Sequence, residues 1–425
     1  MANPEETVAI LGLGYVGLPL VGICVEAGYH VVGFDTATSK VESLRRSESY
    51  VDDVHDQQID EWLRKGFTPS CDPRDLQLAN VFVICVPTPL AKAGGPDLTA
   101  VELAMREVEE TLGRRCEMGM AKSLVVLEST TYPGTTEEVV KPILEKGGLD
   151  AGEDFFLAFS PERIDPGNAD WTIAKTPKLV GGLTEACGDS AETFYRSLGL
   201  AVVRTKGPKE AEMAKLLENT YRHVNIALVN ELWRLSYELG IDVWDVIAAA
   251  ETKPYGFQAF RPGPGVGGHC IPIDPNYLSH RVKSELGQTF RMVELAQDIN
   301  SAMPDYVVGR TQELLNDLGK SLRGSTVLVL GVTYKPGISD MRESPAIPVL
   351  MGLVKRGAKV DFHDPYVEKI VLGDWTLRRV LDPDVSAKDA DCVILVQAHR
   401  EFQELVDSIE SSRILDTRGM KQRTA

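Results

Sequence analysis

The chain has 425 residues, which is too many for one hydrophobic core and predicts two or three domains. Hydrophobic residues make up 43% and charged residues 25%, and these ordinary fractions exclude a disordered or low-complexity chain. The 45 basic and 62 acidic residues give a net charge of −17, which opposes binding to a phosphate backbone, so no nucleic-acid partner is expected.

The seven cysteines are scattered and form no C-x-x-C pair, so neither a disulfide framework nor structural zinc is expected, and a reducing, cytoplasmic compartment fits best. Residues 8–25 carry no charge, but they contain four glycines and a proline and follow two glutamates. This composition predicts a buried strand, a glycine turn and a helix, and no membrane or signal segment is expected.

The first 200 residues alternate short β-branched runs with amphipathic stretches, a pattern typical of a parallel sheet wound with helices. Strands are predicted at 8–14, 30–35, 81–87, 123–130, 155–161 and 178–182.

A long helix is predicted at 209–241, with Gly240 as its C-terminal cap and a reach of ~48 Å. Alternation then resumes, and strands are predicted at 325–332, 358–365, 391–396 and 413–419. The expected fold is α/β, with two doubly wound Rossmann-like sheet domains joined by a long-helix connector. The predicted domains are 1–205, 206–305 and 306–425.

Residues 12–17, Gly-Leu-Gly-Tyr-Val-Gly, follow the first strand and open a helix, so a pyrophosphate can approach the helix N-terminus. Asp35 ends the second strand, at the distance where a carboxylate holds the adenine ribose of a dinucleotide. Because this carboxylate would repel a 2′-phosphate, NAD is expected rather than NADP. The basic residues Lys40, Arg45 and Arg46 are not adjacent to Asp35 in sequence and are expected on a helix surface.

The densest chemical signal is the glycine- and proline-rich run from Arg261 to Asp274, which neither a helix nor a central strand tolerates. Such a loop brings its backbone close to a ligand and delivers Cys270, whose thiolate is a strong nucleophile toward an aldehyde. A metal site formed by His269, Cys270 and Asp274 is the alternative. The spacing matches no common zinc pattern and a fourth ligand is not evident, so no metal is expected.

A polar stripe runs along the predicted long helix, because residues three or four apart lie on one face. The stripe permits two interpretations, a solvated face or an active-site face on which Lys215 and Asn219 jointly stabilise an oxyanion near Cys270. Its members are Glu212, Lys215, Asn219, Arg222 and His223.

Further candidates stand at strand ends, where doubly wound sheets bind their ligands. Glu162 follows Pro161 after an apolar strand, a position where a partly desolvated carboxylate can act as a general base toward water. In the second sheet, Lys335 and Arg342 lie before a predicted helix start and indicate a nucleotide-phosphate site.

Taken in order, these segments resemble the UDP-glucose/GDP-mannose dehydrogenase family over essentially the whole chain. The family oxidises the C6 alcohol of a nucleotide sugar to a carboxylate with NAD, and it has an NAD domain, a helical dimer-forming middle and a nucleotide domain. The matching motifs are GLGYVGLP (12–19), VPTP (86–89), STTYPGTT (129–136), SPER (160–163), AEMAKLLENTYR (211–222), GPGVGGHCIPIDP (263–275) and GVTYKPGISDMRESP (331–345).

The resemblance implies a role for each matching residue. Cys270 would capture the C6 aldehyde as a thiohemiacetal that is oxidised to a thioester, and Glu162 would promote its hydrolysis. Lys215 and Asn219 would stabilise oxyanions, Asp274 would support the cysteine loop, and Thr130 would hold a water. Implied NAD contacts are Gly12, Gly14, Tyr15, Val16, Gly17, Asp35, Pro87, Thr88 and Thr130. Implied substrate contacts are Glu162, Arg163, Lys215, Asn219, Arg222, His223, Arg261, Gly267, Lys335 and Arg342.

Within the family, SPERIDPGN, ENTYRHVNIALVNEL and RPGPGVGGHCIPIDP resemble the branch that acts on UDP-N-acetylhexosamines. UDP-N-acetylglucosamine is the first choice of substrate, UDP-N-acetylmannosamine is close behind, and UDP-glucose ranks second to both. A homodimer or a higher homo-oligomer is implied. Glu128, before Ser-Thr, stands where relatives often have another residue.

Two other functions each fit part of the sequence. A two-electron hydroxy-acid dehydrogenase shares the glycine turn and the lysine–asparagine pair but explains neither Cys270 nor the second sheet. A nucleotide-sugar binder without catalysis predicts the loss of Lys215, Cys270 or Glu162, and all three are present.

Overall fold

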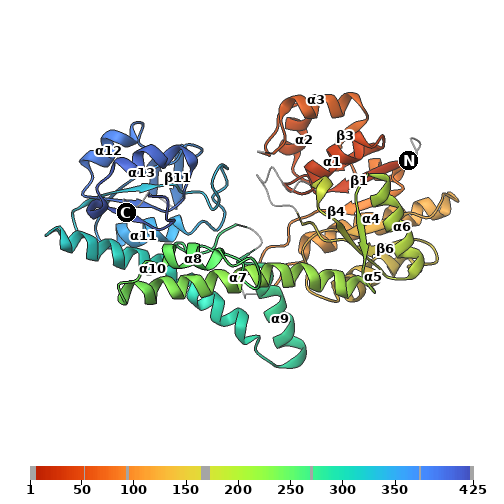
Figure 1. Ribbon diagram of the computed structural model, residues 1–425. Helices are drawn as coiled ribbons and strands as arrows, with labels where there is room; N and C mark the ends of the chain where they lie inside the picture. The colour runs from red at the N-terminus through yellow and green to blue at the C-terminus, as the bar shows by residue number, and fades with distance from the viewer. Residues whose placement is uncertain are drawn as a thin grey trace. The chain divides into compact units, whose positions relative to one another are not determined.

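The computed structural model describes residues 6–51, 53–91, 95–163, 173–268, 271–372 and 375–421 (Figure 1). The chain divides into two compact units, each with its own sheet. Unit 1 comprises Met1–Glu218 and Asn276–Gly287, and unit 2 comprises Asn219–Pro275 and Gln288–Ala425. The predicted division at residues 205 and 305 stays a prediction.

Unit 1 contains an eight-stranded sheet with the strand order β3-β2-β1-β4-β5-β6-β7-β8. All neighbours are parallel except β6 and β7, which pair antiparallel through Ala158–Gly182 and Phe159–Gly181. The strands are β1 Thr7–Leu11, β2 His30–Phe34, β3 Phe67–Ser70, β4 Val81–Ile84, β5 Leu124–Leu127, β6 Phe156–Phe159, β7 Lys178–Gly182 and β8 Val202–Arg204.

All six predicted strands of this unit are present, whereas β3 and β8 were missed. β3 contains Pro69, and β8 is three residues long and only partly buried, so neither shows the apolar run or alternation that marks a strand. The antiparallel pair of β6 and β7 also departs from the predicted parallel sheet.

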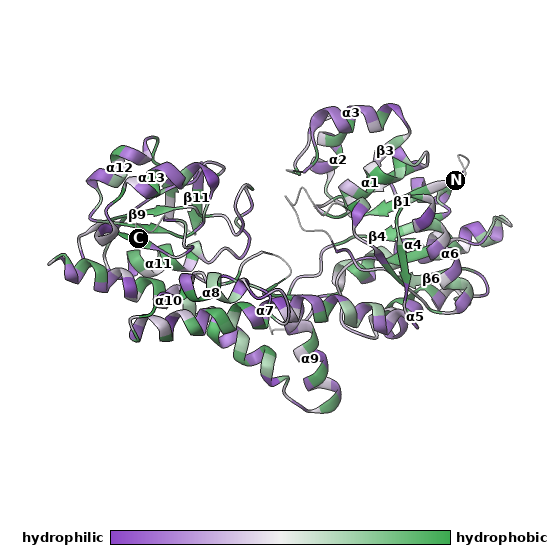
Figure 2. Cartoon of the chain, in the orientation of Figure 1, coloured by the Kyte–Doolittle hydropathy of each residue, from purple (hydrophilic) through white to green (hydrophobic). Residues whose placement is uncertain are grey.

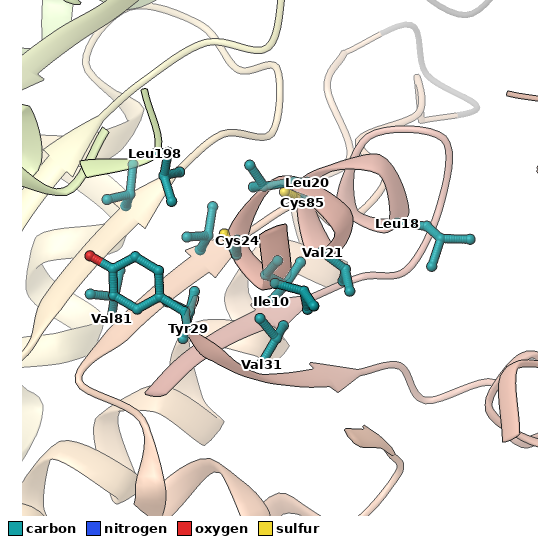
Figure 3. Packing of buried hydrophobic residues seen from close by; sticks show 14 of the residues in the cluster. Ile10, Leu18, Leu20, Val21, Cys24, Tyr29, Val31, Val81, Cys85 and Leu198 are labelled. Atoms are coloured by element: carbon teal, nitrogen blue, oxygen red, sulfur yellow. The ribbon is translucent and has the colours of Figure 1, made fainter. Parts of the chain in front are cut away.

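Alternate residues of the central strands point to opposite faces of the sheet and build two cores. Val8 and Ile10 pack on one face, where α1 (Gly17–Glu26) contributes Leu20, Val21 and Cys24 (Figure 3). The other face packs against α4 and α5. The helices of unit 1 include α2 Thr38–Arg45, α3 Asp56–Arg64, α4 Thr99–Glu117, α5 Lys141–Leu144 and α6 Glu185–Ser197.

The predicted long helix is α7, Pro208–Glu238, whose proline stands at the first helical position, where its missing N–H costs nothing. It begins in unit 1 and continues into unit 2 after Glu218. The other connecting helices are α8 Val243–Glu251, α9 Asp274–Leu286 and α10 Arg291–Asp317. Among the helices described, none has the length and apolar character to cross a membrane.

Unit 2 carries a four-stranded parallel sheet in the order β10-β9-β13-β14, with strands that are hydrophobic like those of unit 1 (Figure 2). These strands, β9 Thr326–Leu330, β10 Lys359–His363, β13 Cys392–Leu395 and β14 Ile414–Asp416, were all predicted. The antiparallel pair β11 Lys369–Leu372 and β12 Trp375–Arg378 was missed. Helices α11 Ala346–Lys355, α12 Pro383–Asp389 and α13 Gln403–Ser408 complete the unit.

Candidate functional site

In the turn after β1, each of the three glycines occupies its position for a different physical reason. Gly12 has φ 95°, and a Cβ there would lie 2.6 Å from the carbonyl oxygen of Cys85. A Cβ at Gly17 would lie 1.9 Å from the Gly12 oxygen, so both positions need glycine for packing. At Gly14 a Cβ would meet nothing within 4 Å, so the backbone faces open space there. The first turn of α1 carries no acidic residue, and this combination fits a pyrophosphate at the helix N-terminus.

Asp35 follows β2 and is held toward this turn by its own hydrogen bonds. Its carboxylate accepts from the Leu13 N–H at 3.0 Å and the Ala37 N–H at 2.9 Å, and it is buried. Lys40 Nζ lies 3.0 Å from Asp35 Oδ2, and its side chain is 39% exposed. Lys40 is thus a partly exposed helix charge, as expected, but its pairing with Asp35 was not predicted. Because α2 starts at Thr38, its first turn brings residue 40 back over the strand end.

The polar stripe on α7 is largely buried. Glu212, Lys215 and His223 are buried, Asn219 is partly exposed and Arg222 is exposed. The solvated-face interpretation is therefore wrong for the buried members. Among the apolar residues of this part of α7, Met213 is 42% and Leu217 63% exposed, whereas Leu216 is fully buried.

Glu212 connects α7 to the STTYPGTT segment. Its carboxylate accepts from the Gly134 N–H at 2.6 Å, the Thr136 N–H at 2.9 Å and the Thr136 hydroxyl at 2.7 Å. Burial raises the pKa of Glu212 to about 7, although these three donors oppose the rise. The side chain thus fixes the segment that also carries Thr130, which is half-buried after β5.

Glu162 and Lys215 form the reactive pair of unit 1. Lys215 Nζ donates to the backbone oxygen of Glu162 at 2.5 Å and lies 3.6 Å from its Oε2. Burial raises the pKa of Glu162, although Lys215 and Lys178 both oppose the rise. A carboxylate that is desolvated yet close to cations is suited to take a proton from a water molecule.

The neighbouring predicted residues of unit 1 have clear local partners. Arg163 donates to Glu218, at 2.6 Å from Nη2, and to the Pro177 oxygen at 2.9 Å. The carbonyl of buried Thr88 accepts from the hydroxyl of Tyr277 on α9, while Pro87 is exposed. Tyr15 and Val16 in the glycine turn are partly buried and pack on the core beneath α1.

In unit 2, Asn219 and Asp274 are joined directly, because Asn219 Nδ2 donates to Asp274 Oδ2 at 2.5 Å. Asp274 is buried and opens α9. Asn219 follows Lys215 by four residues on α7, so both side chains project from the same face of that helix.

His223, predicted to contact substrate, is fully buried beside Asn300, whose Nδ2 donates to the His223 oxygen at 3.2 Å. Burial lowers the pKa of His223 to about 4, so the ring is neutral near pH 7.

The glycine-rich loop packs on the 334–345 segment of unit 2. A Cβ at Gly267 would lie 2.7 Å from the Glu343 oxygen, and the Gly268 N–H donates to the Arg342 oxygen at 3.1 Å. At the start of the loop, Arg261 is half-exposed and pairs with Glu251 at 2.9 Å. His269 and Cys270 lie outside the described residues, so the role of Cys270 stays a prediction.

The proposed phosphate-binding cations of unit 2 lie in the segment against which the loop packs. Arg342 forms a bidentate pair with Asp340, with Nη2 at 2.6 Å, and remains half-exposed. Lys335 is partly buried, and its carbonyl accepts from the Thr333 hydroxyl at 2.9 Å. Among the residues that the structure describes, no three His, Cys, Asp or Glu side chains are grouped to hold a metal ion. Two of the three residues of the alternative metal site lie outside that set.

Glu128 has two buried partners that were not predicted from the sequence, Lys178 and Tyr195. A lysine at the start of an otherwise apolar strand, KLVGG, was the available signal, since a buried lysine requires a partner. Glu128 itself stood out before Ser-Thr, but its partner lies on another strand.

The site is typical of a dinucleotide-dependent oxidoreductase. It combines a glycine turn beside an acidic strand end, a buried carboxylate–lysine pair and a second parallel sheet with a turn of the same kind. Models of the UDP-glucose/GDP-mannose dehydrogenase family match residues 6–199 (NAD binding domain), 209–302 (central domain) and 328–423 (UDP binding domain). The chain belongs to this family, binds NAD and acts on a nucleotide sugar.

Similar proteins carry several substrate names. The chain is 36% identical over 403 residues to UDP-N-acetyl-D-glucosamine 6-dehydrogenase of Pseudomonas aeruginosa, covering 94% of this chain and 92% of that protein. It resembles the structure of a UDP-D-ManNAc dehydrogenase from Pyrococcus horikoshii, with TM-score 0.86, 33% identity and coverage of 99% and 97%. It also resembles a UDP-glucose dehydrogenase from Pyrobaculum islandicum, with TM-score 0.87, 29% identity and coverage of 98% and 95%.

Proposed function

We propose that this protein oxidises the C6 hydroxyl of a UDP-N-acetylhexosamine to the uronic acid through a thioester on Cys270. The first choice of substrate is UDP-N-acetylglucosamine. The supporting observation is the buried Glu162 beside Lys215, with a raised pKa. A four-electron route ends in hydrolysis and therefore needs a base toward water, whereas a two-electron hydroxy-acid dehydrogenase does not.

The proposed chemistry balances as one alcohol, two NAD⁺ and one water giving one carboxylate, two NADH and three protons. When bound, NAD accepts one hydride in each of the two oxidations. Between them the Cys270 sulfur bonds to the aldehyde carbon, and Lys215 and Asn219 stabilise the charge on its oxygen. In the last step Glu162 takes a proton from water while the water oxygen bonds to the acyl carbon and the carbon–sulfur bond breaks.

The choice of an N-acetylhexosamine rests on the sequence motifs and on relatives that carry such names. UDP-N-acetylmannosamine and UDP-glucose are the alternatives, because relatives with those names match over nearly the whole chain. The orientation of one hydroxyl separates the gluco from the manno sugar, so a direct assay is needed.

The proposed assembly is a homodimer formed through α7. Within unit 2 this helix exposes Tyr221, Leu228, Leu232 and Leu235 at spacings of seven, four and three residues, which places them on one face. A repeated apolar stripe of this kind suits a second copy of the same helix, and the resemblance to a dimer-forming family favours that partner.

The test incubates the purified protein with NAD and, separately, UDP-glucose and the UDP-N-acetyl derivatives of glucosamine, mannosamine and galactosamine. We expect about two NADH per acid formed, with UDP-N-acetylglucosamine used fastest. One NADH per product would support the two-electron alternative, and no NADH with any sugar would support the non-catalytic binder.

A further inference from the structure

Unit 1 contains a buried ion pair that the proposed chemistry leaves unused. Lys178, at the start of β7, lies 2.8 Å from Glu128, which follows β5, and their side chains are only 10% and 2% exposed. The hydroxyl of Tyr195 on α6 donates to the other carboxylate oxygen of Glu128, and its ring lies 5.2 Å from Lys178 Nζ. Burying such a pair costs desolvation free energy, so stability alone explains it poorly.

The ammonium of Lys178 also reaches the loop that carries Glu162. Nζ donates to the Pro161 oxygen at 3.3 Å, while Lys215 Nζ donates to the Glu162 oxygen at 2.5 Å. The two carbonyls flanking the Glu162 Cα are therefore each held by a lysine. Because β6 ends at Phe159, the strand ladder does not fix this loop. The two lysines restrain it together with Arg163, which donates to Glu218 and to the Pro177 oxygen.

We call Lys178 and Lys215, with the Pro161 and Glu162 carbonyls that they hold, the clamp. A small cleft borders it. Glu128, Glu162 and Lys178 line it together with Val16 of the glycine turn. Its volume of about 20 Å³ is enough for one water molecule. The clamp thus borders a space of the size that a hydrolytic water requires.

We propose that Lys178, anchored by Glu128 and Tyr195, is a positioning residue that fixes the Glu162 carboxylate for thioester hydrolysis. The inference rests on the proposed function, because it takes Glu162 as the base of that step. Lys178 acts by holding the Pro161 carbonyl and by placing a second cation near Glu162, in addition to Lys215.

The charges around Glu162 predict in which direction its pKa should shift when a neighbour is replaced. Lys178 lowers the pKa of Glu162 and Glu128 raises it, while burial raises it most. Replacing Lys178 by a neutral residue should raise that pKa further, and neutralising Glu128 should lower it. The charged or titratable groups around Glu162 are Lys215 on α7, Lys178 on β7, Glu128 after β5, Arg163 in its own loop, Tyr195 on α6 and Cys85 after β4.

The test compares Lys178→Met, the conservative Lys178→Arg, and Arg204→Met. The last is a control on β8 of the same sheet that removes the three ion pairs of Arg204 with Glu185, Asp189 and Glu192 on α6. With the UDP-sugar that the wild type oxidises, rapid-quench measurement should show an unchanged first NADH burst in Lys178→Met. Steady acid formation should fall about 10- to 100-fold, and intact mass should show an accumulated acyl-enzyme. Lys178→Arg should recover much of the rate, and Arg204→Met should match the wild type.

The pH dependence distinguishes positioning from general damage. The acidic limb of kcat should move to higher pH in Lys178→Met and to lower pH in Glu128→Gln, each by roughly one unit. Wild-type hydrolysis and an unmoved acidic limb in both variants would overturn the clamp. Shifts in the same direction, with equal losses of melting temperature, would also overturn it. Failure of the wild type to form any acid would instead refute the proposed function, so the two failures are distinguishable. If Lys178→Met does not fold, Glu128→Gln carries the test through the expected shift of its acidic limb to lower pH.

Discussion

In both sheets the first strand ends in the same hydrogen-bonded turn, formed by a glycine and an aspartate, but the surroundings of the aspartate differ. In unit 1 the Gly12 N–H donates to the Phe34 oxygen at 2.8 Å, and the Asp35 carboxylate accepts from the Leu13 N–H at 3.0 Å. In unit 2 the Gly331 N–H donates to the His363 oxygen at 2.9 Å.

The Asp364 carboxylate of unit 2 likewise accepts from the Val332 N–H at 2.7 Å. Each aspartate also accepts from the backbone two residues ahead, at Ala37 and at Tyr366. Residues 7–15 and 326–334 share the pattern T-V-x-x-L-G-x-x-Y, so the likeness lies in this short sequence as well as in the backbone geometry.

The difference lies in what the aspartate meets. Asp35 pairs with Lys40, whose side chain is 39% exposed, whereas Asp364 pairs at 3.0 Å with His399 and both are fully buried. After the turn, α1 starts directly at Gly17 in unit 1, while in unit 2 the chain runs through 331–345 before α11 starts at Ala346. One strand-end geometry therefore supports a helix N-terminus in one sheet and a long cation-bearing loop in the other.

The largest contrast is expected from the turn glycines. Gly12→Ala should weaken NAD binding at least about 100-fold, because a Cβ there combines a positive φ with a 2.6 Å approach to the Cys85 oxygen. Gly28→Ala is the matched control, since Gly28 also has a positive φ but open space. It should cost about 1 kcal/mol of stability and leave NAD binding unchanged. Isothermal titration with NAD measures both, and equal affinities of the two variants would contradict the packing argument.

The same substitution in the second turn should affect the other nucleotide. Gly331→Ala brings a Cβ to 2.5 Å from the Gln397 oxygen, and Gly337→Ala, at a positive φ in open space, is its control. We expect weaker UDP binding and unchanged NAD binding in Gly331→Ala only. A loss of NAD affinity would show that the two turns are not independent.

Stability should depend on pH in opposite directions in the two units. The pKa of Glu212 in unit 1 is raised by burial to about 7, so its stabilising contribution is full below the unfolded value and is lost as pH rises toward 7. The pKa of His223 in unit 2 is lowered by burial to about 4, so stability is lost as pH falls below about 6.5. Each contribution amounts to about 3 kcal/mol. Because the two contributions oppose each other between about pH 4.5 and 6.5, Glu212→Gln should leave a stability that rises with pH, and His223→Gln should leave one that falls with pH. Denaturant melts from about pH 4 to 7 measure both, and an unchanged profile in either variant would contradict the assignment.

Substitutions of Asp35 and Asp364 should have different effects, the first on NAD binding and the second on stability. Asp35→Ala should weaken NAD about 10-fold and reduce the discrimination against NADP, because the ribose-binding carboxylate is lost. Asp364→Asn should leave NAD binding intact and lower stability by about 1–3 kcal/mol, because it disturbs a fully buried pair with His399. Titrations with both dinucleotides and a thermal melt distinguish the two outcomes. Unchanged cofactor preference in Asp35→Ala would defeat its assignment.

The smallest effect is expected at Lys40. Lys40→Met removes a partly exposed partner of Asp35, and such pairs contribute at most about 1 kcal/mol. We expect NAD affinity to change less than about 5-fold, with Arg46→Met, which removes an exposed pair with Glu48, as the control. A loss as large as that of Asp35→Ala would mean that Lys40 itself binds the cofactor.

Local chemistry explains what the sequence determined by itself. The strands at 7–11 and 326–330 follow from apolar runs, and the positions of Gly12, Gly17 and Asp35 follow from the spacing of a βα turn. The density of glycine and proline between Arg261 and Asp274 predicted the loop before Cys270, because neither a helix nor a central strand tolerates such a run.

Tertiary structure alone decided which polar side chains meet. Glu128 and Lys178 stand fifty positions apart and become neighbours because β6 and β7 pair antiparallel, and Lys178 lies at the start of β7. Likewise, only packing buried Glu212 and His223 while leaving Leu217 in solvent, against the periodicity of α7. Patterns along a chain encode the backbone, whereas desolvation and charge pairing depend on distances that only the folded chain sets.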